Sequence, residues 1–350
     1  MLPYWLLFSY FAGGALLRRP RNKGRDSFPL LALGALILAL LVGLRHEVGA
    51  DWEQYRFMFS YAAYADLDRQ LRIGDPAYQA LNWMVQRAGG GLWTVNLICG
   101  AIFSWGLWRL CREQREPWLA MLVAVPYLVV VVAMGYTRQA VAIGILMAGL
   151  ASLLRGGSTA RFILFVGAAA LFHKSAVVVL PLVAFAGDRN RLVNLALAAA
   201  ATVLFYNIFL EQSVDALVRN YIVAEYSSQG AMIRVAMSLV PALIFLARPS
   251  LFDFDDRERK IWRNFSLAAV ALAVALIVSP SSTAVDRLAL YVLPLQVVIL
   301  ARVPGSLLSR GLGISAIVAY SFAVQFVWLN FATHAEYWLP YQFTPLFEAG

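Results

Sequence analysis

Residues 118–154 read WLAMLVAVPYLVVVVAMGYTRQAVAIGILMAGLASLL, two apolar runs separated by a short polar interruption that contains Arg138. Each run approaches the ~20 residues that an α-helix needs to cross a bilayer. Backbone N–H and C=O groups in lipid must be satisfied within the chain, so both runs are predicted to be transmembrane helices. There is almost no loop between them to account for a guanidinium group. The stretch therefore predicts a helical membrane protein with a polar site at a membrane edge.

The composition of the whole chain agrees with this prediction. Of 350 residues 61% are hydrophobic and 14% are charged, whereas soluble domains carry about 25% charged residues. This excludes a soluble enzyme, a disordered chain and a disulfide scaffold. The two cysteines have no zinc-ligand spacing, and the sequence lacks HExxH, Walker and GxGxxG motifs as well as an Asp-rich magnesium motif. We therefore expect no metal and no cofactor.

The apolar runs predict an all-α, polytopic integral membrane protein that forms one domain over residues 1–350. Basic residues between the runs orient the chain, because Lys and Arg concentrate in cytoplasmic loops. This bias also accounts for the net charge of +9 without nucleic-acid binding. The runs fall at about 2–17, 29–44, 92–108, 118–134, 138–154, 161–187, 192–210, 232–247, 264–279, 286–302 and 311–329.

The run 161–187 has two interpretations. One long span would place the basic loop 248–263 outside, whereas a short two-helix hairpin with its tip near 172–175 keeps that loop in the cytoplasm. The charge bias favours the hairpin. The prediction is about ten full spans plus the hairpin, with both termini outside.

Three longer segments then face outside: 45–91, 211–231 and 330–350. In the first, Trp52, Tyr55 and Phe59 recur with helical spacing. They are typical of interfacial helices in an aromatic belt, or of a platform on which sugars stack. We therefore expect any reaction that takes place outside the bilayer to occur on this outer face.

Cationic side chains close several predicted spans at the outer side, namely Arg45, Arg138, Lys174 and Arg287. Ionisable groups at a membrane edge are costly and usually functional. Cations crowded in a low dielectric repel one another unless an anion joins them. We therefore predict an outer-face cavity that binds an anion, for which a lipid-linked pyrophosphate is suited.

Acidic groups lie near the same predicted depth. Asp286, Glu47 and Asp51 can neutralise some of the cations, and Glu47, Asp51 or His173 can accept a proton from an attacking hydroxyl. Simpler roles stay open for single residues. Asp51 could cap a helix, and His173 could be a hydrogen-bonded packing residue. The side chain of Arg45 or Arg287 could simply extend to the membrane interface.

Four strings occur in this order along the chain: Arg45-x-x-x-Gly49-Ala50-Asp51-Trp52-x-x-Tyr55, Tyr136-x-Arg138-Gln139-Ala140, Phe172-His173-Lys174-Ser175-Ala176 and Trp338-Leu339-Pro340-Tyr341. Together they resemble the EpsG family, which is grouped with Wzy-type O-antigen and capsule polymerases. The first string departs from the family's usual Gly-Thr-Asp-Tyr, because alanine and tryptophan occupy its second and fourth positions.

The resemblance implies a glycosyltransferase of the bacterial inner membrane with its active face outside. Such proteins join oligosaccharide repeat units carried on undecaprenyl pyrophosphate, and the growing chain passes to the non-reducing end of a new unit. The lipid pyrophosphate leaves, so neither a nucleotide sugar nor a metal is required. The implied partners are this lipid-linked oligosaccharide, membrane lipids, a chain-length regulator and a flippase.

The resemblance also implies residue roles. Arg138, Arg287 and Arg45 bind the donor pyrophosphate, and Asp51 is the general base, with Glu47 or His173 as substitutes. A lipid-linked oligosaccharide flippase, a transferase that modifies the polysaccharide and a structural membrane subunit are the competing functions. The remaining implied contacts to substrate are Lys174, Trp52, Tyr55, Tyr136, Gln139 and Trp338.

Overall fold

The computed structural model describes residues 1–17, 28–184, 230–279 and 282–344, together with isolated positions between 196 and 203. Most of the predicted span 192–210 and of the predicted outer segment 211–231 lies outside the described residues. In these ranges the chain is almost entirely helical, as the composition predicts. The helices are α1 (Leu2–Leu17), α2 (Phe28–Gly43), α3 (Trp52–Tyr61), α4 (Leu67–Arg72), α5 (Pro76–Arg87), α6 (Leu92–Cys111), α7 (Pro117–Ala124), the π-helix η1 (Val125–Ala133), α8 (Thr137–Leu154), α9 (Thr159–Phe172), η2 (Lys174–Val179), α10 (Leu180–Ala184), α13 (Ala231–Ala247), η6 (Pro249–Leu251), α14 (Asp256–Val278), α15 (Ser282–Ala289), η7 (Leu290–Val292), α16 (Leu293–Leu300), α17 (Arg310–Phe331) and η8 (Ala335–Trp338).

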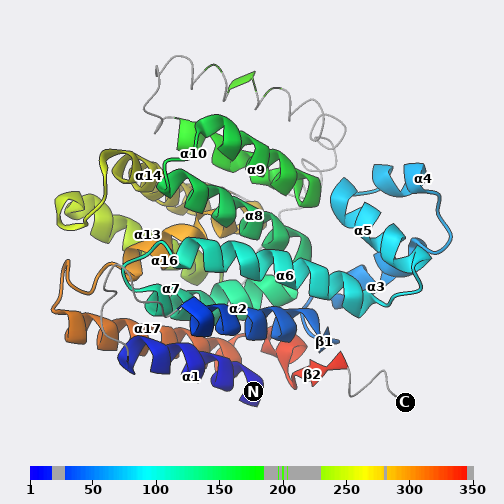
Figure 1. Ribbon diagram of the computed structural model, residues 1–350, viewed down its shortest axis with the longest axis horizontal. Helices are drawn as coiled ribbons and strands as arrows, with labels where there is room; N and C mark the ends of the chain where they lie inside the picture. The colour runs from blue at the N-terminus through cyan, green and yellow to red at the C-terminus, as the bar shows by residue number, and fades with distance from the viewer. Residues whose placement is uncertain are drawn as a thin grey trace.

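The central layer consists of α7 with η1, α8 and α16, whose residues are buried along almost their whole length. Around it, α1, α2, α6, α9, α13, α14 and α17 run side by side (Figure 1). These outer helices expose large apolar side chains such as Leu6, Ile277 and Phe331. Contiguous exposed apolar faces of this extent are unfavourable in water and suit contact with lipid. The structure thus supports a helical membrane protein.

Five helical segments are long and apolar enough to cross a membrane by length and composition: 92–111, 137–154, 256–278, 282–300 and 310–331. Six shorter apolar helices accompany them in the described part of the chain, at 2–17, 29–43, 117–133, 159–172, 174–183 and 231–247. These helices support the predicted helical membrane protein but do not establish the predicted number of ten full spans.

The helical run is interrupted at His173, inside the predicted hairpin tip. Helix α9 ends at Phe172, His173 is extended with φ −157° and ψ 110°, and η2 begins at Lys174. Helix α9 packs against both η2 and α10, so the chain turns back after the break. The side of the membrane that this tip faces stays a prediction.

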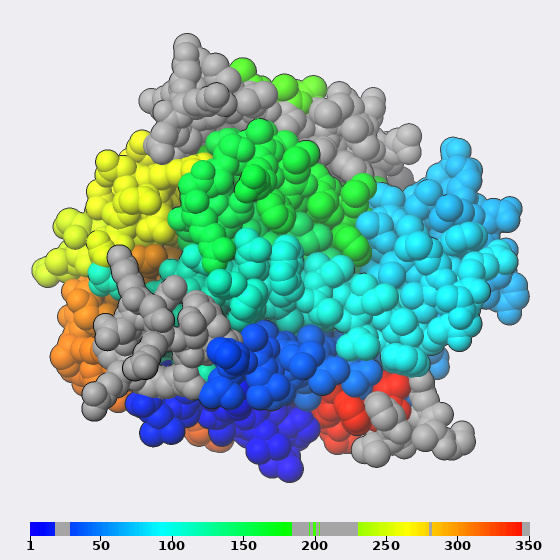
Figure 2. All heavy atoms as spheres, in the orientation of Figure 1, coloured from blue at the N-terminus to red at the C-terminus, as the bar shows by residue number. Residues whose placement is uncertain are grey.

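A small β-pair departs from a purely helical fold. Strand β1 (Arg45–His46) pairs antiparallel with β2 (Gln342–Phe343). In Figure 1 this pair lies at the same end of the bundle as α3, α4 and α5. In Figure 2 the α3–α5 segment, in light blue, projects from that end. The C-terminal segment therefore fastens residues 45–46 to the end of the bundle where the sequence motifs gather.

Candidate functional site

The site is built around the start of α8. Helix α8 begins at Thr137 after Tyr136, whose φ of −126° and ψ of 64° end the preceding helical run. Two glycines allow the chain to crowd this break. A Cβ on Gly49 would lie 2.3 Å from the carbonyl oxygen of Met134, and one on Gly135 would lie 2.6 Å from the ring of Trp338. The segment that precedes Asp51 is thereby held directly against the start of α8.

Arg138, in the first turn of α8, forms an ion pair with Asp75. Its Nη1 donates to Asp75 Oδ2 at 2.8 Å, and the two side chains are 20% and 8% exposed. Asp75 precedes α5 in the N-cap position, yet its carboxylate makes no capping hydrogen bond. Its Oδ1 instead accepts from the backbone N–H of Lys174 at 3.3 Å. Asp75 thus joins α5, α8 and the break at His173.

Burial and charge act on Asp75 in opposite directions. Burial raises the pKa of this carboxyl group, while the positive charges of Arg138 and Lys174 act to lower it. The guanidinium of Arg138 also lies 5.9 Å from the ring centroid of Tyr55 on α3. Arg138 is therefore held between a carboxylate and an aromatic face.

Arg287, on α15, reaches the same region from the other side. Its guanidinium carbon lies 4.0 Å from the ring centroid of Tyr136, a cation–π distance. Gln139 Nε2 donates to the backbone carbonyl of Arg287 at 2.7 Å. The Tyr136-x-Arg138-Gln139 string thus holds α15 as well as α5.

Asp51 is within electrostatic reach of the guanidinium groups of both Arg287 and Arg138. Burial raises the pKa of Asp51, and the charges of Arg287 and then Arg138 act to lower it. Asp51 occupies the N-cap position of α3 but makes no side-chain capping hydrogen bond. The simpler role as a helix cap is therefore not supported, and the carboxyl group interacts electrostatically with Arg287 and Arg138 instead.

His173 contacts a tyrosine at the edge of this cluster. The distance between its Nδ1 and the hydroxyl oxygen of Tyr291 is 2.8 Å. Arg138 and Arg287 are both within electrostatic reach of the imidazole. The ring is thus fixed in place and is adjacent to the charged groups.

Arg45 has a different environment from Arg138 and Arg287. It is fully buried, and its guanidinium donates to Thr137 Oγ1 at 2.7 Å, to the carbonyl of Val48 at 3.2 Å and to the carbonyl of Val42. These bonds tie the end of α2 to the start of α8. The arrangement is that of a structural arginine, so we leave Arg45 out of the proposed phosphate site.

The other predicted residues are placed unequally. Glu47 is exposed and lies beside His46 at 4.0 Å. Trp338 is 1% exposed and its indole N–H donates to the carbonyl of Val130 at 2.7 Å. Trp52 and Tyr55 are also buried. The cluster that the structure brings together, hereafter the cation cluster, consists of Asp51, Asp75, Tyr136, Arg138, His173, Lys174 and Arg287.

A model of the EpsG family matches residues 30–343. The chain belongs to the EpsG family. Its members are Wzy-type polysaccharide polymerase-like proteins, so this EpsG-family chain has a function of the polysaccharide polymerase type. No curated protein and no solved structure matches the chain.

Two functional candidates in this EpsG-family chain were missed from sequence. Asp75 follows a glycine and precedes a proline, a pattern that predicts only a turn and a helix start. Arg234, near the start of α13, forms a two-pronged ion pair with Asp286 at 2.7 and 2.6 Å. Asp75 and Asp286 each pair with an arginine more than 50 residues away in the sequence. No local sequence pattern indicates either pairing.

No group of three or more His, Cys, Asp or Glu side chains that could hold a metal ion occurs among the described residues.

Proposed function

We propose that this protein is a glycosyltransferase that polymerises oligosaccharide repeat units carried on undecaprenyl pyrophosphate at the outer leaflet of the bacterial inner membrane. The growing glycan passes from one lipid carrier to the non-reducing end of a new unit. Membership of the EpsG family supports the reaction class. The residue roles are supported by the cation cluster.

The observation that carries the proposal is the convergence of chemically distinct groups from separate parts of the chain. Arg138, Lys174 and Arg287 come from α8, η2 and α15, and Asp51 precedes α3. They meet at one end of the bundle, where Asp51 is within electrostatic reach of both arginines. A binding surface for an anion beside a carboxyl base is the requirement for displacing a pyrophosphate with a hydroxyl.

In the proposed step, a hydroxyl oxygen of the acceptor sugar attacks the anomeric carbon of the donor. The bond from that carbon to the pyrophosphate oxygen breaks, and the electron pair leaves with the lipid pyrophosphate. Asp51 accepts the hydroxyl proton. Arg138 and Arg287 stabilise the negative charge that develops on the leaving group, because a guanidinium fork matches phosphate oxygens.

The remaining residues have supporting roles in this proposal. Lys174 adds a point charge beside the donor, and His173 is the alternative proton acceptor. Tyr136 and Gln139 hold Arg287, while Tyr55 holds Arg138. A chain-length regulator and a flippase are proposed partners in the cell.

The test is incubation of the purified protein with lipid-linked repeat units as the sole substrate. We expect a ladder of longer lipid-linked glycans without any nucleotide sugar. Arg138→Lys should abolish the ladder although the protein still inserts, because an ammonium group cannot reproduce the fork. The exposed Arg72→Lys on α4 is the matched control and should leave the ladder unchanged. Absence of a ladder from the unmodified protein, with transport of the lipid across vesicles, would instead identify a flippase.

A further inference from the structure

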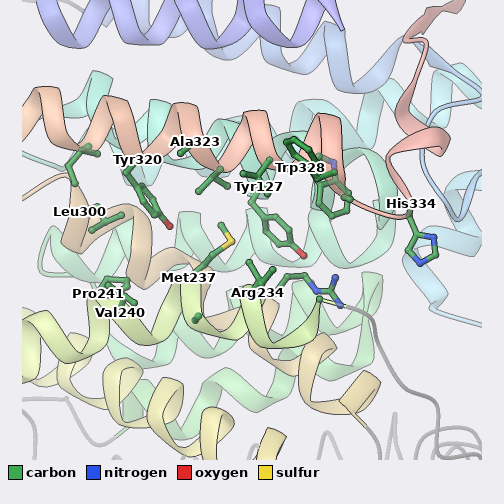
Figure 3. A pocket seen from close by; sticks show the side chains of 18 of the residues that line it. Tyr127, Arg234, Met237, Val240, Pro241, Leu300, Tyr320, Ala323, Trp328 and His334 are labelled. Carbon is green, nitrogen blue, oxygen red and sulfur yellow. The ribbon is translucent and has the colours of Figure 1, made fainter.

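An apolar cavity lies between α13 and α17. Its volume is about 710 Å³. Its walls include Met237 and Val240 on α13 and Ala323 on α17, and its floor includes Tyr127 on η1 (Figure 3). Side chains at its edge, Val240 and Val327 among them, are exposed. The cavity is thus open along the apolar outer surface of the bundle.

The cavity has one polar end. In Figure 3 Arg234 and His334 lie at one end and Leu300 at the other. Arg234 holds Asp286 through both carboxylate oxygens, and the next residue, Arg287, contacts Tyr136 in the cation cluster. One ion pair therefore separates the polar end of the cavity from the groups proposed to bind pyrophosphate.

The dimensions favour a long single chain. The lining residues run from Gly230, which caps α13, to Ile244 on α13, and from Ile317 to Phe331 on α17. At 1.5 Å per residue each wall is about 20 Å long. One leaflet of a ~30 Å hydrocarbon core is only about 15 Å deep. A polyprenyl chain is not confined to the depth of one leaflet and can follow the groove over this whole length, toward the end that adjoins the cation cluster.

We infer that this cavity, the α13–α17 groove, holds the polyprenyl tail of the lipid-linked donor while its pyrophosphate lies at the cation cluster. The inference rests on the proposed function and adds the subsite that selects the lipid. Burial of the tail along α13 and α17 places the anomeric carbon at the end of the bundle where Asp51 and Arg287 lie.

Photolabelling in nanodiscs tests the inference with the full chain. The probe is polyprenyl pyrophosphate that carries a diazirine in its tail and no sugar. We expect its adducts in peptides from α13 and α17. Ala323→Trp places an indole in the groove, and Ala236→Trp does so from the opposite wall. Each should lower labelling at least about tenfold, the factor expected when about two methylene contacts are displaced.

Ala319→Trp is the matched control. Ala319 lies one turn from Ala323 on the same helix and is likewise exposed, but it does not line the groove. Labelling and melting temperature of this variant should match the unmodified protein. Adducts that lie outside α13 and α17, or undiminished labelling of both groove variants, would overturn the assignment. Equal competition by phosphatidylglycerol and by unlabelled polyprenyl pyrophosphate would also overturn it, because ordinary membrane lipid would then be the occupant.

The two proposals fail separately. A polymerising protein whose adducts map elsewhere has the proposed function without this groove. A protein that labels in the groove but forms no ladder binds the lipid without being a polymerase.

Discussion

Replacement of Asp75 by Asn should impair transfer by misplacing Arg138. The substitution keeps the shape of the side chain and an acceptor oxygen at 2.8 Å from Arg138 Nη1, but it removes the charge. Arg138 stays charged, so the bond to the amide oxygen keeps one charged partner and loses the attraction of the second charge. We take this loss as roughly 1–2 kcal/mol, within the range of hydrogen bonds to charged groups, which corresponds to a factor of about 5–30. We expect kcat/KM for the lipid-linked unit to fall by this factor.

Asp75→Asn also has an effect on substrate binding that opposes the loss of activity. Loss of a carboxylate leaves more positive charge near the substrate and on that ground alone would strengthen binding of an anion. We expect the positional effect to dominate because Asp75 also accepts from the backbone N–H of Lys174 at 3.3 Å. Both cations lose a common support in the variant.

The assay is the rate of glycan extension at varied lipid-linked unit, with Asp68→Asn as the control. Asp68 also pairs with an arginine on the same segment, Arg72 at 3.1 Å, but its side chain is 79% exposed. That variant should retain full activity, because exposed ion pairs contribute little. Because Arg138→Lys is expected to leave no transfer to measure, the double-mutant cycle is measured by the affinity for lipid pyrophosphate. Asp75→Asn should cause no further loss of this affinity in an Arg138→Lys background.

A purely structural role for Asp75 would give a different result. It would lower the melting temperature and cause an additive loss of affinity for lipid pyrophosphate in the double mutant. Unchanged or increased kcat/KM in Asp75→Asn would refute the argument that Asp75 positions Arg138.

Three further outcomes are expected. Asp51→Asn should lower kcat by about 10²–10⁴-fold, and full activity of this variant would exclude Asp51 as the base. Burial raises the pKa of Asp51 above its ordinary 3.8. The unmodified protein should therefore lose activity as the pH falls through that raised pKa, because the base becomes protonated. Gly135→Ala forces a methyl group to 2.6 Å from Trp338 and should lower the melting temperature, at a cost of about 1–3 kcal/mol; Gly13→Ala, with no atom within 4 Å, should not lower it. Arg45→Ala leaves buried acceptors on Val42, Val48 and Thr137 without their donor and should destabilise the protein by about 1–3 kcal/mol. A melting temperature equal to that of the unmodified protein would count against its structural role.

The helical membrane fold could be predicted because its cause is local. Apolar runs near the length of a bilayer require helices whatever their neighbours are, and the interruption at Gly135 and Tyr136 marks where α8 begins. The break at His173 was also visible, because a histidine and a lysine interrupt an apolar run. The β-pair between Arg45–His46 and Gln342–Phe343 was not visible, since two-residue strands carry no periodic signal.

The candidate site could be predicted in part, since charged residues at the ends of apolar runs stand out. Their roles could not be separated, because Arg45 and Arg138 look alike in sequence. The difference depends on side chains from elsewhere: Thr137 and backbone carbonyls saturate Arg45, whereas Arg138 faces Asp75 and Tyr55. Sequence position gives no measure of such pairing, which arises only when α5 packs against α6 and α9 and brings Asp75 to the start of α8.

The balance of charge in the cluster explains why the acids matter as much as the cations. Guanidinium groups buried without counter-charges would destabilise the empty protein, so Asp75 and Asp286 each hold one arginine before any substrate arrives. The cations still outnumber the acids, which leaves a positive charge to meet a pyrophosphate. If the acids were all neutralised by burial, the cluster would attract phosphate more strongly but would hold its arginines less well. Removal of Asp75 and removal of Asp286 should therefore both weaken transfer while they increase the salt dependence of lipid pyrophosphate binding, a combination that simple unfolding would not produce.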